Sequence, residues 1–145
     1  MPDSAAQPPI ALLVEDEPLI ALALEDALAA AGFRVLLACG AAEALAAPAE
    51  LLAVAVVDLR LGDGPDGRAV VAALRRRAPG LPVVVATGYA ADAPQADLRG
   101  LGGPTTRLAK PRDLDELGDA VRHVIRRRDE GIPPGHGRRR GDRRV

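Results

Sequence analysis

The sequence predicts an α/β fold with three α/β/α layers, in which helices cover both faces of a doubly wound, five-stranded parallel sheet. Two observations lead to this prediction. Three of five predicted strands, Pro9–Val14, Ala53–Val57 and Leu81–Ala86, are apolar at every position rather than at alternate positions, which is typical of strands buried on both faces. Segments with helical periodicity separate most of the predicted strands, and right-handed crossovers would place such helices on the two faces. At 145 residues the chain is long enough for one domain with a sizeable core.

The first half of the chain alternates strand and helix. Pro9–Val14 is a continuous apolar run, and it is followed by three acids and by Pro18, a residue favoured in the first turn of a helix. Leucines and alanines at helical spacing then continue up to a stop signal at Gly32. Phe33–Ala38 is the next predicted strand, and Ala41–Ala47 is a short helix that ends at a proline.

The second half repeats this order. The central strand Ala53–Val57 runs into Asp58, and a helix from Asp66 or Gly67 closes with the basic triplet 75–77, which solvation and the helix dipole explain. Strand Leu81–Ala86 follows, and any helix within 91–103 is short and weakly held. Strand Thr105–Ala109 precedes a final helix capped by Asp113. The inward stripe of that helix is Leu114, Leu117, Val121, Val124 and Ile125.

Composition and charge divide the chain into three parts. We expect a flexible lead over 1–8, one domain over 9–128 and a disordered Arg-rich tail over 129–145, because the tail lacks apolar periodicity. With one tyrosine and one phenylalanine, the chain lacks the aromatic platforms of stacking-based nucleic-acid modules. No segment reaches the length of a membrane span or resembles a signal peptide, so we expect a cytoplasmic protein. The single cysteine, Cys39, is interpreted as a small buried hydrophobe.

Four strand ends carry polar side chains that a parallel sheet would bring to one edge: Asp16, Asp58, Thr87 and Lys110. Crowded carboxylates repel one another, and a hard divalent cation bound by their oxygens would relieve that repulsion. In a cell we expect this cation to be Mg²⁺. A carboxylate beside the cation can attack a phosphoryl group, whose oxygens the cation, the ammonium and the hydroxyl can satisfy. The alternative interpretation of Glu15, Asp16 and Glu17 is that they cap the following helix and complement its dipole, and the alternative for Asp58 is that it caps the loop.

The combination of Glu15-Asp16, Asp58, Thr87 and Lys110-Pro111 resembles the response-regulator receiver domain of two-component signalling, which is CheY-like and flavodoxin-like in fold. The resemblance spans roughly 9–127. It implies that Asp58 is the phosphoacceptor, and that Glu15, Asp16, Asp58 and the backbone carbonyl of Arg60 hold Mg²⁺. It also implies that Thr87 is the switch hydroxyl, and that Lys110 contacts the phosphate before a candidate cis peptide at Pro111. The run Ala86-Thr87-Gly88-Tyr89 is similar to a variant found in a subgroup of receivers.

The chain departs from the usual receiver pattern near its switch residues. Arg107 stands three residues before the lysine, where most receivers have Tyr or Phe. Tyr89 is the ring that could replace that aromatic, although a plain packing role explains it equally well. The loop after Asp58 and the Arg after Pro111 are also atypical. Output can therefore differ from that of other receivers, while the phosphorylation chemistry has all its parts.

We therefore expect a stand-alone receiver rather than an enzyme, with self-catalysed phosphoryl transfer and slow autodephosphorylation. Its partner would be a sensor histidine kinase or a phosphotransfer protein, and it would have no membrane segment and no fused DNA-binding domain. A dimer or target could use the 88–125 face. Two alternatives remain. One is a receiver-like binding module that works unphosphorylated, and the other is nucleic-acid binding by the tail, which would fall steeply with salt.

Overall fold

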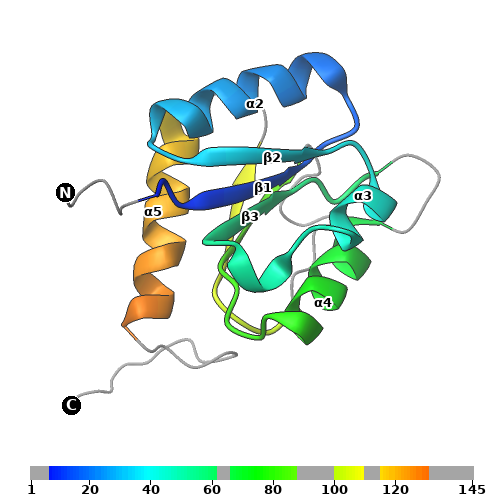
Figure 1. Ribbon diagram of the computed structural model, residues 1–145, viewed down its shortest axis with the longest axis vertical. Coiled ribbons are helices and arrows are strands. Elements are labelled where there is room, and N and C mark those ends of the chain that lie inside the picture. The colour runs from blue at the N-terminus through cyan, green and yellow to red at the C-terminus, as the bar shows by residue number, and fades with distance from the viewer. Residues whose placement is uncertain (1–6, 62–65, 88–99, 110–114, 131–145) are drawn as a thin grey trace.

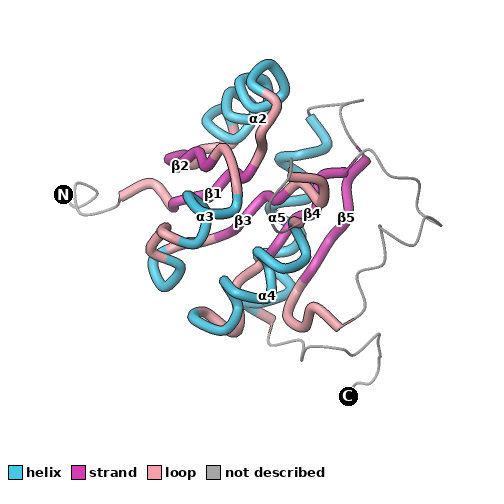
Figure 2. Tube along the Cα trace, turned by 90° about the vertical axis from the view of Figure 1, so that its right-hand side faces the viewer, coloured by secondary structure: helices cyan, strands magenta, loops and turns pink. Residues whose placement is uncertain are grey.

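A computed structural model of the protein describes residues 7–61, 66–87, 100–109 and 115–130. Five strands form one parallel sheet, as the sequence predicts, and their order in the sheet is β2-β1-β3-β4-β5. Helices α2 and α5 cover one face, and α3 and α4 cover the other (Figures 1 and 2). The elements are β1 (Ile10–Val14), α2 (Pro18–Ala30), β2 (Arg34–Ala38), α3 (Ala41–Leu45), the 3₁₀ turn η1 (Ala49–Leu51), β3 (Val54–Val57), α4 (Gly67–Arg77), β4 (Val83–Thr87), β5 (Thr105–Ala109) and α5 (Asp115–Asp129).

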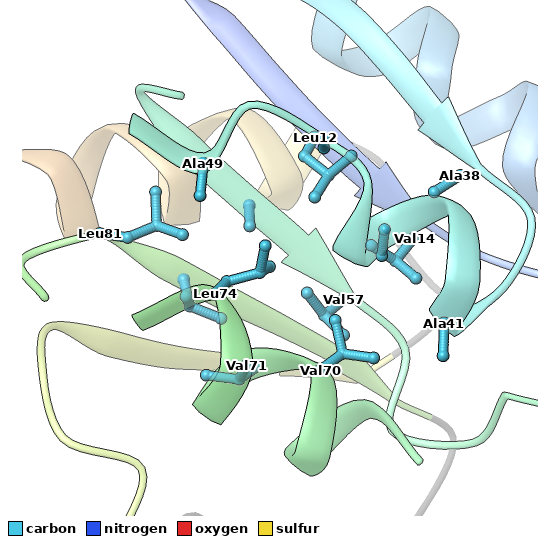
Figure 3. Packing of buried hydrophobic residues seen from close by; sticks show 14 of the residues in the cluster. Leu12, Val14, Ala38, Ala41, Ala49, Val57, Val70, Val71, Leu74 and Leu81 are labelled. Atoms are coloured by element: carbon cyan, nitrogen blue, oxygen red, sulfur yellow. The ribbon is translucent and has the colours of Figure 1, made fainter. Parts of the chain in front are cut away.

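The core consists of two apolar clusters, one on each face of the sheet. Within β1, Leu12 and Val14 belong to the cluster under α3 and α4, whereas Leu13 belongs to the cluster under α2 and α5. Figure 3 shows Val14 and Val57 facing Val70 of α4. Because both faces are covered, alternate residues of a strand enter different clusters. This explains why the inner strands β1, β3 and β4 lie in continuous apolar runs of the sequence.

Helix α2 buries a narrower face than its leucine content suggests. Ala21, Leu24 and Leu28 face the sheet, but the side chains of Leu19 and Leu22 are 78% and 57% exposed. The buried positions recur at three- and four-residue intervals, so the helical period is correct while the two exposed leucines fall outside its inward stripe.

Element bounds differ little from the prediction. β2 begins at Arg34 rather than Phe33, and α3 ends at Leu45, after which the 3₁₀ turn η1 connects to β3. Helix α4 begins at Gly67, where the Asp66 carboxylate accepts a hydrogen bond of 3.1 Å from the Ala69 N–H. Asp66 is therefore the N-cap residue of this helix.

The basic triplet at the end of α4 is not uniformly solvated, which corrects the prediction for Arg75. This side chain is 7% exposed, and its guanidinium donates to four backbone carbonyl oxygens and one hydroxyl. The acceptors are Leu81 O, Leu101 O, Gly102 O, Pro104 O and Thr105 Oγ1. Arg75 thereby joins α4 to the starts of β4 and β5, and it acts as an internal cross-link rather than as a solvated charge.

The prediction of a buried Cys39 is wrong, because this thiol is exposed. Ala38, the last residue of β2, is buried, and the chain then turns outward into α3. The Cys39 backbone N–H donates to Glu43 Oε1 at 2.5 Å, so the turn is held through the backbone while the thiol faces solvent.

Helix α5 packs as predicted through Leu117, Val121 and Val124, which are fully buried, and Ile125 is partly buried. The predicted cap Asp113 and its neighbour Leu114 lie outside the described residues, as do positions 1–6 and 131–145 of the predicted lead and tail. Residues 91–99 of the region 91–103, where a short and weakly held helix was expected, also lie outside the described residues. Within the described parts of the chain, none of the helices combines the length and apolarity that crossing a bilayer requires.

Candidate functional site

The site is built where β1 and β3 end side by side. These strands are parallel neighbours with Val14 opposite Val57, and the Asp58 N–H donates a 3.0 Å hydrogen bond to Val14 O. On its other side β1 is held by a 3.0 Å bond from the Glu15 N–H to Ala38 O. The residues that follow both strands therefore emerge together at the carboxyl edge of the sheet, as the sequence predicts.

Three carboxylates meet at this edge. Glu15, Asp16 and Asp58 each offer an oxygen within 4.8 Å of the others. Glu15 is 1% exposed and Asp58 is 6% exposed, whereas Asp16 is exposed to solvent. The cluster therefore has a buried floor and a solvent-accessible side.

Backbone N–H groups orient the two buried carboxylates. The Glu17 N–H donates to Glu15 Oε2 at 3.1 Å, and the Arg60 N–H donates to Asp58 Oδ1 at 3.1 Å. Glu17 occupies the N-cap position of α2, but its side chain makes no capping hydrogen bond. The prediction that the Glu17 side chain caps this helix is thus wrong, whereas its interaction with the helix dipole stays a prediction. Glu15 holds the backbone of the turn before α2, and this is compatible with a further role for its carboxylate.

The donor set suits a hard divalent cation. All three clustered side chains are carboxylates, and such oxygens are the ligands that Mg²⁺ and Ca²⁺ take. Like charges this close repel one another, and partial burial removes the water that would screen them. A bound cation would relieve that repulsion, so the residues present fit the predicted metal site.

The other predicted site residues are only partly covered by the structure. Thr87 is the last residue of β4, and its backbone pairs with Ala109, the last residue of β5; its side chain lies outside the description. Lys110, Pro111 and Tyr89 lie outside the described residues, as do 88–99 and 110–114 of the predicted 88–125 interaction face. Arg107 lies on β5 opposite Val85 and is half-buried.

Sequence reasoning missed one neighbour of the site, Gly67. The first residue of α4 lies against the backbone of Asp58, so closely that a Cβ at this position would be 2.1 Å from Asp58 O. The sequence identified Gly67 as a helix start, but its spacing from Asp58 across a loop did not indicate a contact.

The fold and this edge define a class of protein: parallel α/β domains with a carboxylate cluster suited to a cation at the strand ends. Comparison with known families assigns the chain within that class, because residues 11–122 match the response regulator receiver domain. The chain belongs to this family, and it is a receiver domain related to the response regulators of bacterial two-component systems.

Individual relatives agree with this assignment. The acid tolerance regulatory protein ActR of Sinorhizobium medicae is 36% identical over 124 residues, which are 85% of this chain and 61% of ActR. The chain thus spans less than two thirds of that relative. A sensor protein from Polaromonas has a solved structure with 33% identity and a TM-score of 0.70, covering 83% of this chain and 98% of that one.

A second solved structure bears on the metal. The receiver domain of the sensor histidine kinase PA1611 from Pseudomonas aeruginosa is 26% identical, with a TM-score of 0.70 and coverage of 82% of this chain and 98% of that one. That structure is described with a magnesium ion coordinated in its active-site cleft.

Proposed function

We propose that Asp58 accepts a phosphoryl group from a sensor histidine kinase or phosphotransfer protein in the cytoplasm, in a Mg²⁺-dependent reaction. The observation that carries this proposal is the convergence of Glu15, Asp16 and Asp58, whose carboxylate oxygens lie within 4.8 Å of one another at the carboxyl edge of the sheet. Membership of the receiver family supports the same conclusion.

Asp58 is the nucleophile in this proposal. One carboxylate oxygen forms a bond to phosphorus as the bond from phosphorus to the donor breaks, and the electron pair of that bond leaves with the donor. The product is an acyl phosphate on Asp58. The Arg60 N–H, 3.1 Å from Asp58 Oδ1, holds the carboxylate in one orientation, and the β1 hydrogen bond fixes its backbone. Both restraints lower the entropy lost on reaching a reactive geometry.

Glu15, Asp16, Asp58 and the backbone carbonyl of Arg60 would hold the cation. A bound Mg²⁺ supplies positive charge that allows an anionic nucleophile and an anionic phosphoryl group to approach each other. Glu15 is buried and bonded to the Glu17 N–H, so it contributes a fixed carboxylate to the floor of the site. Asp16 is exposed and contributes a carboxylate on the solvent side.

The remaining phosphoryl oxygens would be satisfied by Thr87 and Lys110. β4 and β5 end level with each other, at Thr87 and Ala109, and Lys110 is the next residue. Phosphorylation adds about two negative charges and strong acceptors, which would draw the Thr87 hydroxyl and the Lys110 ammonium towards Asp58. In this proposal a partner protein senses the movement by binding the 88–125 face. Tyr89 and Arg107 are the side chains that would move with Thr87, in place of the Tyr or Phe of most receivers.

The proposal is tested by incubating the protein with Mg²⁺ and acetyl phosphate and measuring phosphate uptake by intact-protein mass spectrometry. We expect labelling that requires Asp58, is absent in EDTA and falls at least tenfold in Asp16→Asn. Asp26→Asn is the matched control, because it removes an exposed acid of α2 outside the cluster. Undiminished labelling of Asp58→Asn would refute the assignment.

A further inference from the structure

The phosphoacceptor residue is in contact with the start of helix α4 through backbone atoms. A Cβ on Gly67 would lie 2.1 Å from Asp58 O, 2.8 Å from Asp58 C and 2.7 Å from the Leu59 Cα. Real Cβ atoms essentially never approach another atom within 3.0 Å. Because the opposing atoms belong to the backbone, they cannot rotate away as the end of a flexible side chain could. Any residue other than glycine must therefore push the helix and the strand end apart by about 1 Å.

This contact is held from the α4 side. The Gly67 N–H donates a 2.9 Å hydrogen bond to Leu59 O, which ties the first residue of the helix to the residue after the phosphoacceptor. The Asp66 carboxylate caps the first turn through Ala69 N, and Val70 is fully buried one turn further on. The helix start therefore cannot easily slide away from the strand end.

The contact is also held from the sheet side. The Asp58 N–H is bonded to Val14 O at 3.0 Å, so the residue lies between the end of β1 and the start of α4. The Arg60 N–H then bonds the Asp58 carboxylate at 3.1 Å. The backbone N–H and the carboxylate of Asp58 are both held by hydrogen bonds. A displacement of the Asp58 backbone would therefore change the position of its carboxylate.

We propose that Gly67 is a positioning residue for phosphoryl transfer: by lacking a side chain, it lets α4 press on the Asp58–Leu59 peptide and fix the nucleophile beside Glu15 and Asp16. This inference rests on the proposed function. A misplacement of about 1 Å at a reacting centre can lower a rate on the order of 100-fold. Gly67 would then affect chemistry without touching the phosphoryl group.

The main test is the Gly67→Ala variant, with Gly40→Ala as its matched control. Gly40 also stands at the start of a helix, but a Cβ there would meet nothing within 4 Å. We expect Gly67→Ala to lower the labelling rate at saturating Mg²⁺, per folded molecule, at least tenfold, and to weaken Mg²⁺ affinity about threefold or more. Gly40→Ala stays within about twofold of wild type.

The readouts separate positioning from stability. The folded fraction is measured by urea unfolding, and Mg²⁺ affinity by calorimetry, which requires no phosphoryl transfer. If glycine is needed only for folding, the rate per folded molecule and the Mg²⁺ affinity of Gly67→Ala equal those of wild type, and the inference is wrong. If wild type is not labelled, or if Asp58→Asn is, the proposed function fails instead, and the Mg²⁺ affinity still decides the role of Gly67.

A second pair of variants decides the matter if Gly67→Ala does not fold. Asp66→Ala removes the cap that holds the start of α4 without adding an atom, whereas Asp66→Asn keeps a capping oxygen and removes only the charge. We expect Asp66→Ala to lower the labelling rate about two- to fivefold and Asp66→Asn to restore it. Equal rates in Asp66→Ala and wild type would overturn the inference.

Discussion

The backbone N–H of Asp58 donates a hydrogen bond of 3.0 Å to the carbonyl oxygen of Val14. This bond extends the parallel ladder of β1 and β3 by one step beyond the pair Val14 and Val57. It places the acid after one strand next to the acids after the other, so the carboxylate cluster is a consequence of strand register. A shift of register by one residue would turn these side chains to opposite faces.

Neutralising one member of the cluster should stabilise the metal-free protein. Three carboxylates within 4.8 Å repel one another, and Asn at position 58 keeps an oxygen for the Arg60 N–H. We expect Asp58→Asn to raise the free energy of unfolding in EDTA by about 1–3 kcal/mol, as charges at this separation near a protein surface interact with a few kcal/mol. Urea unfolding measures the change. A lower stability for Asp58→Asn than for Asp26→Asn would show that the cluster is not repulsive.

Magnesium should stabilise wild type and have a weaker effect on the variants. A ligand that binds only the folded state adds about 2.7 kcal/mol at a concentration 100 times its dissociation constant. We expect a Mg²⁺-dependent rise in the melting temperature of wild type and of Asp26→Asn. The rise should be sharply reduced in Asp16→Asn, which replaces one charged carboxylate of the cluster with a neutral amide. Equal Mg²⁺ responses in Asp16→Asn and wild type would place the binding site elsewhere.

Thr87→Ala should separate phosphorylation from switching. Asp58 remains the nucleophile in this variant, so labelling by acetyl phosphate should persist within about tenfold of wild type, whereas the hydroxyl that would follow the phosphoryl group is gone. We expect hydrogen exchange in peptides covering 88–109 to change on phosphorylation of wild type and not of Thr87→Ala. Thr106→Ala is a control on β5. The same exchange response in Thr87→Ala would exclude this hydroxyl as the switch.

Much of the fold could be predicted because its strands are buried on both faces. Val54–Val57 and Val83–Ala86 are almost entirely excluded from solvent, so an uninterrupted apolar run was sufficient to identify each strand. The edge strand β2 departs from this pattern, since Arg34 and Leu37 are exposed. Parallel pairing then brought Asp16 and Asp58, two of the four residues expected at one edge, to the same edge of the sheet.

Features that depend on contacts across the fold could not be predicted. Arg75 looked identical to the neighbouring arginines, because nothing local marks the carbonyl groups of 101–104 that surround it. The contact between Gly67 and Asp58 depends on how α4 docks on the sheet. Cys39 was judged by its residue type, but exposure at a strand end is decided by the direction of the following turn.

The exposed thiol of Cys39 should react in the native state. Because it is the single cysteine and is exposed, a maleimide should modify one thiol per chain without denaturant, about as fast as in urea. Cys39→Ser should leave Asp58 labelling within about twofold of wild type, since Cys39 is outside the carboxylate cluster. Protection of the thiol until urea is added would show that this turn is closed in solution.

Arg75 should be the most costly of the three arginines at the end of α4 to replace. Its guanidinium is surrounded by Leu81 O, Pro104 O and the other acceptors of 101–105, and a Cβ on Gly103 would lie 2.6 Å from Arg75 Cζ. Arg75→Met fills the space of the stem but leaves buried carbonyl groups without donors, and we expect it to lower the free energy of unfolding by about 2–4 kcal/mol. Arg76→Ala, at an exposed position, should cost less than about 0.5 kcal/mol.

The pH dependence of this loss distinguishes a buried cation from simple packing. Burial lowers the pKa of Arg75 to about 10, below the ordinary value of an arginine, so the side chain is charged in both the folded and the unfolded state well below pH 10. Only between the folded and the unfolded pKa of Arg75 does the unfolded state bind more protons than the folded state. In that pH range the free energy of unfolding of wild type increases with pH relative to that of Arg75→Met. Between pH 6 and 9 the stability difference should therefore be constant. Arg75→Lys should recover only part of it, because an ammonium cannot reproduce the planar fork of donors. A difference that changes by more than about 1 kcal/mol across pH 6 to 9, or full recovery by lysine, would contradict this account.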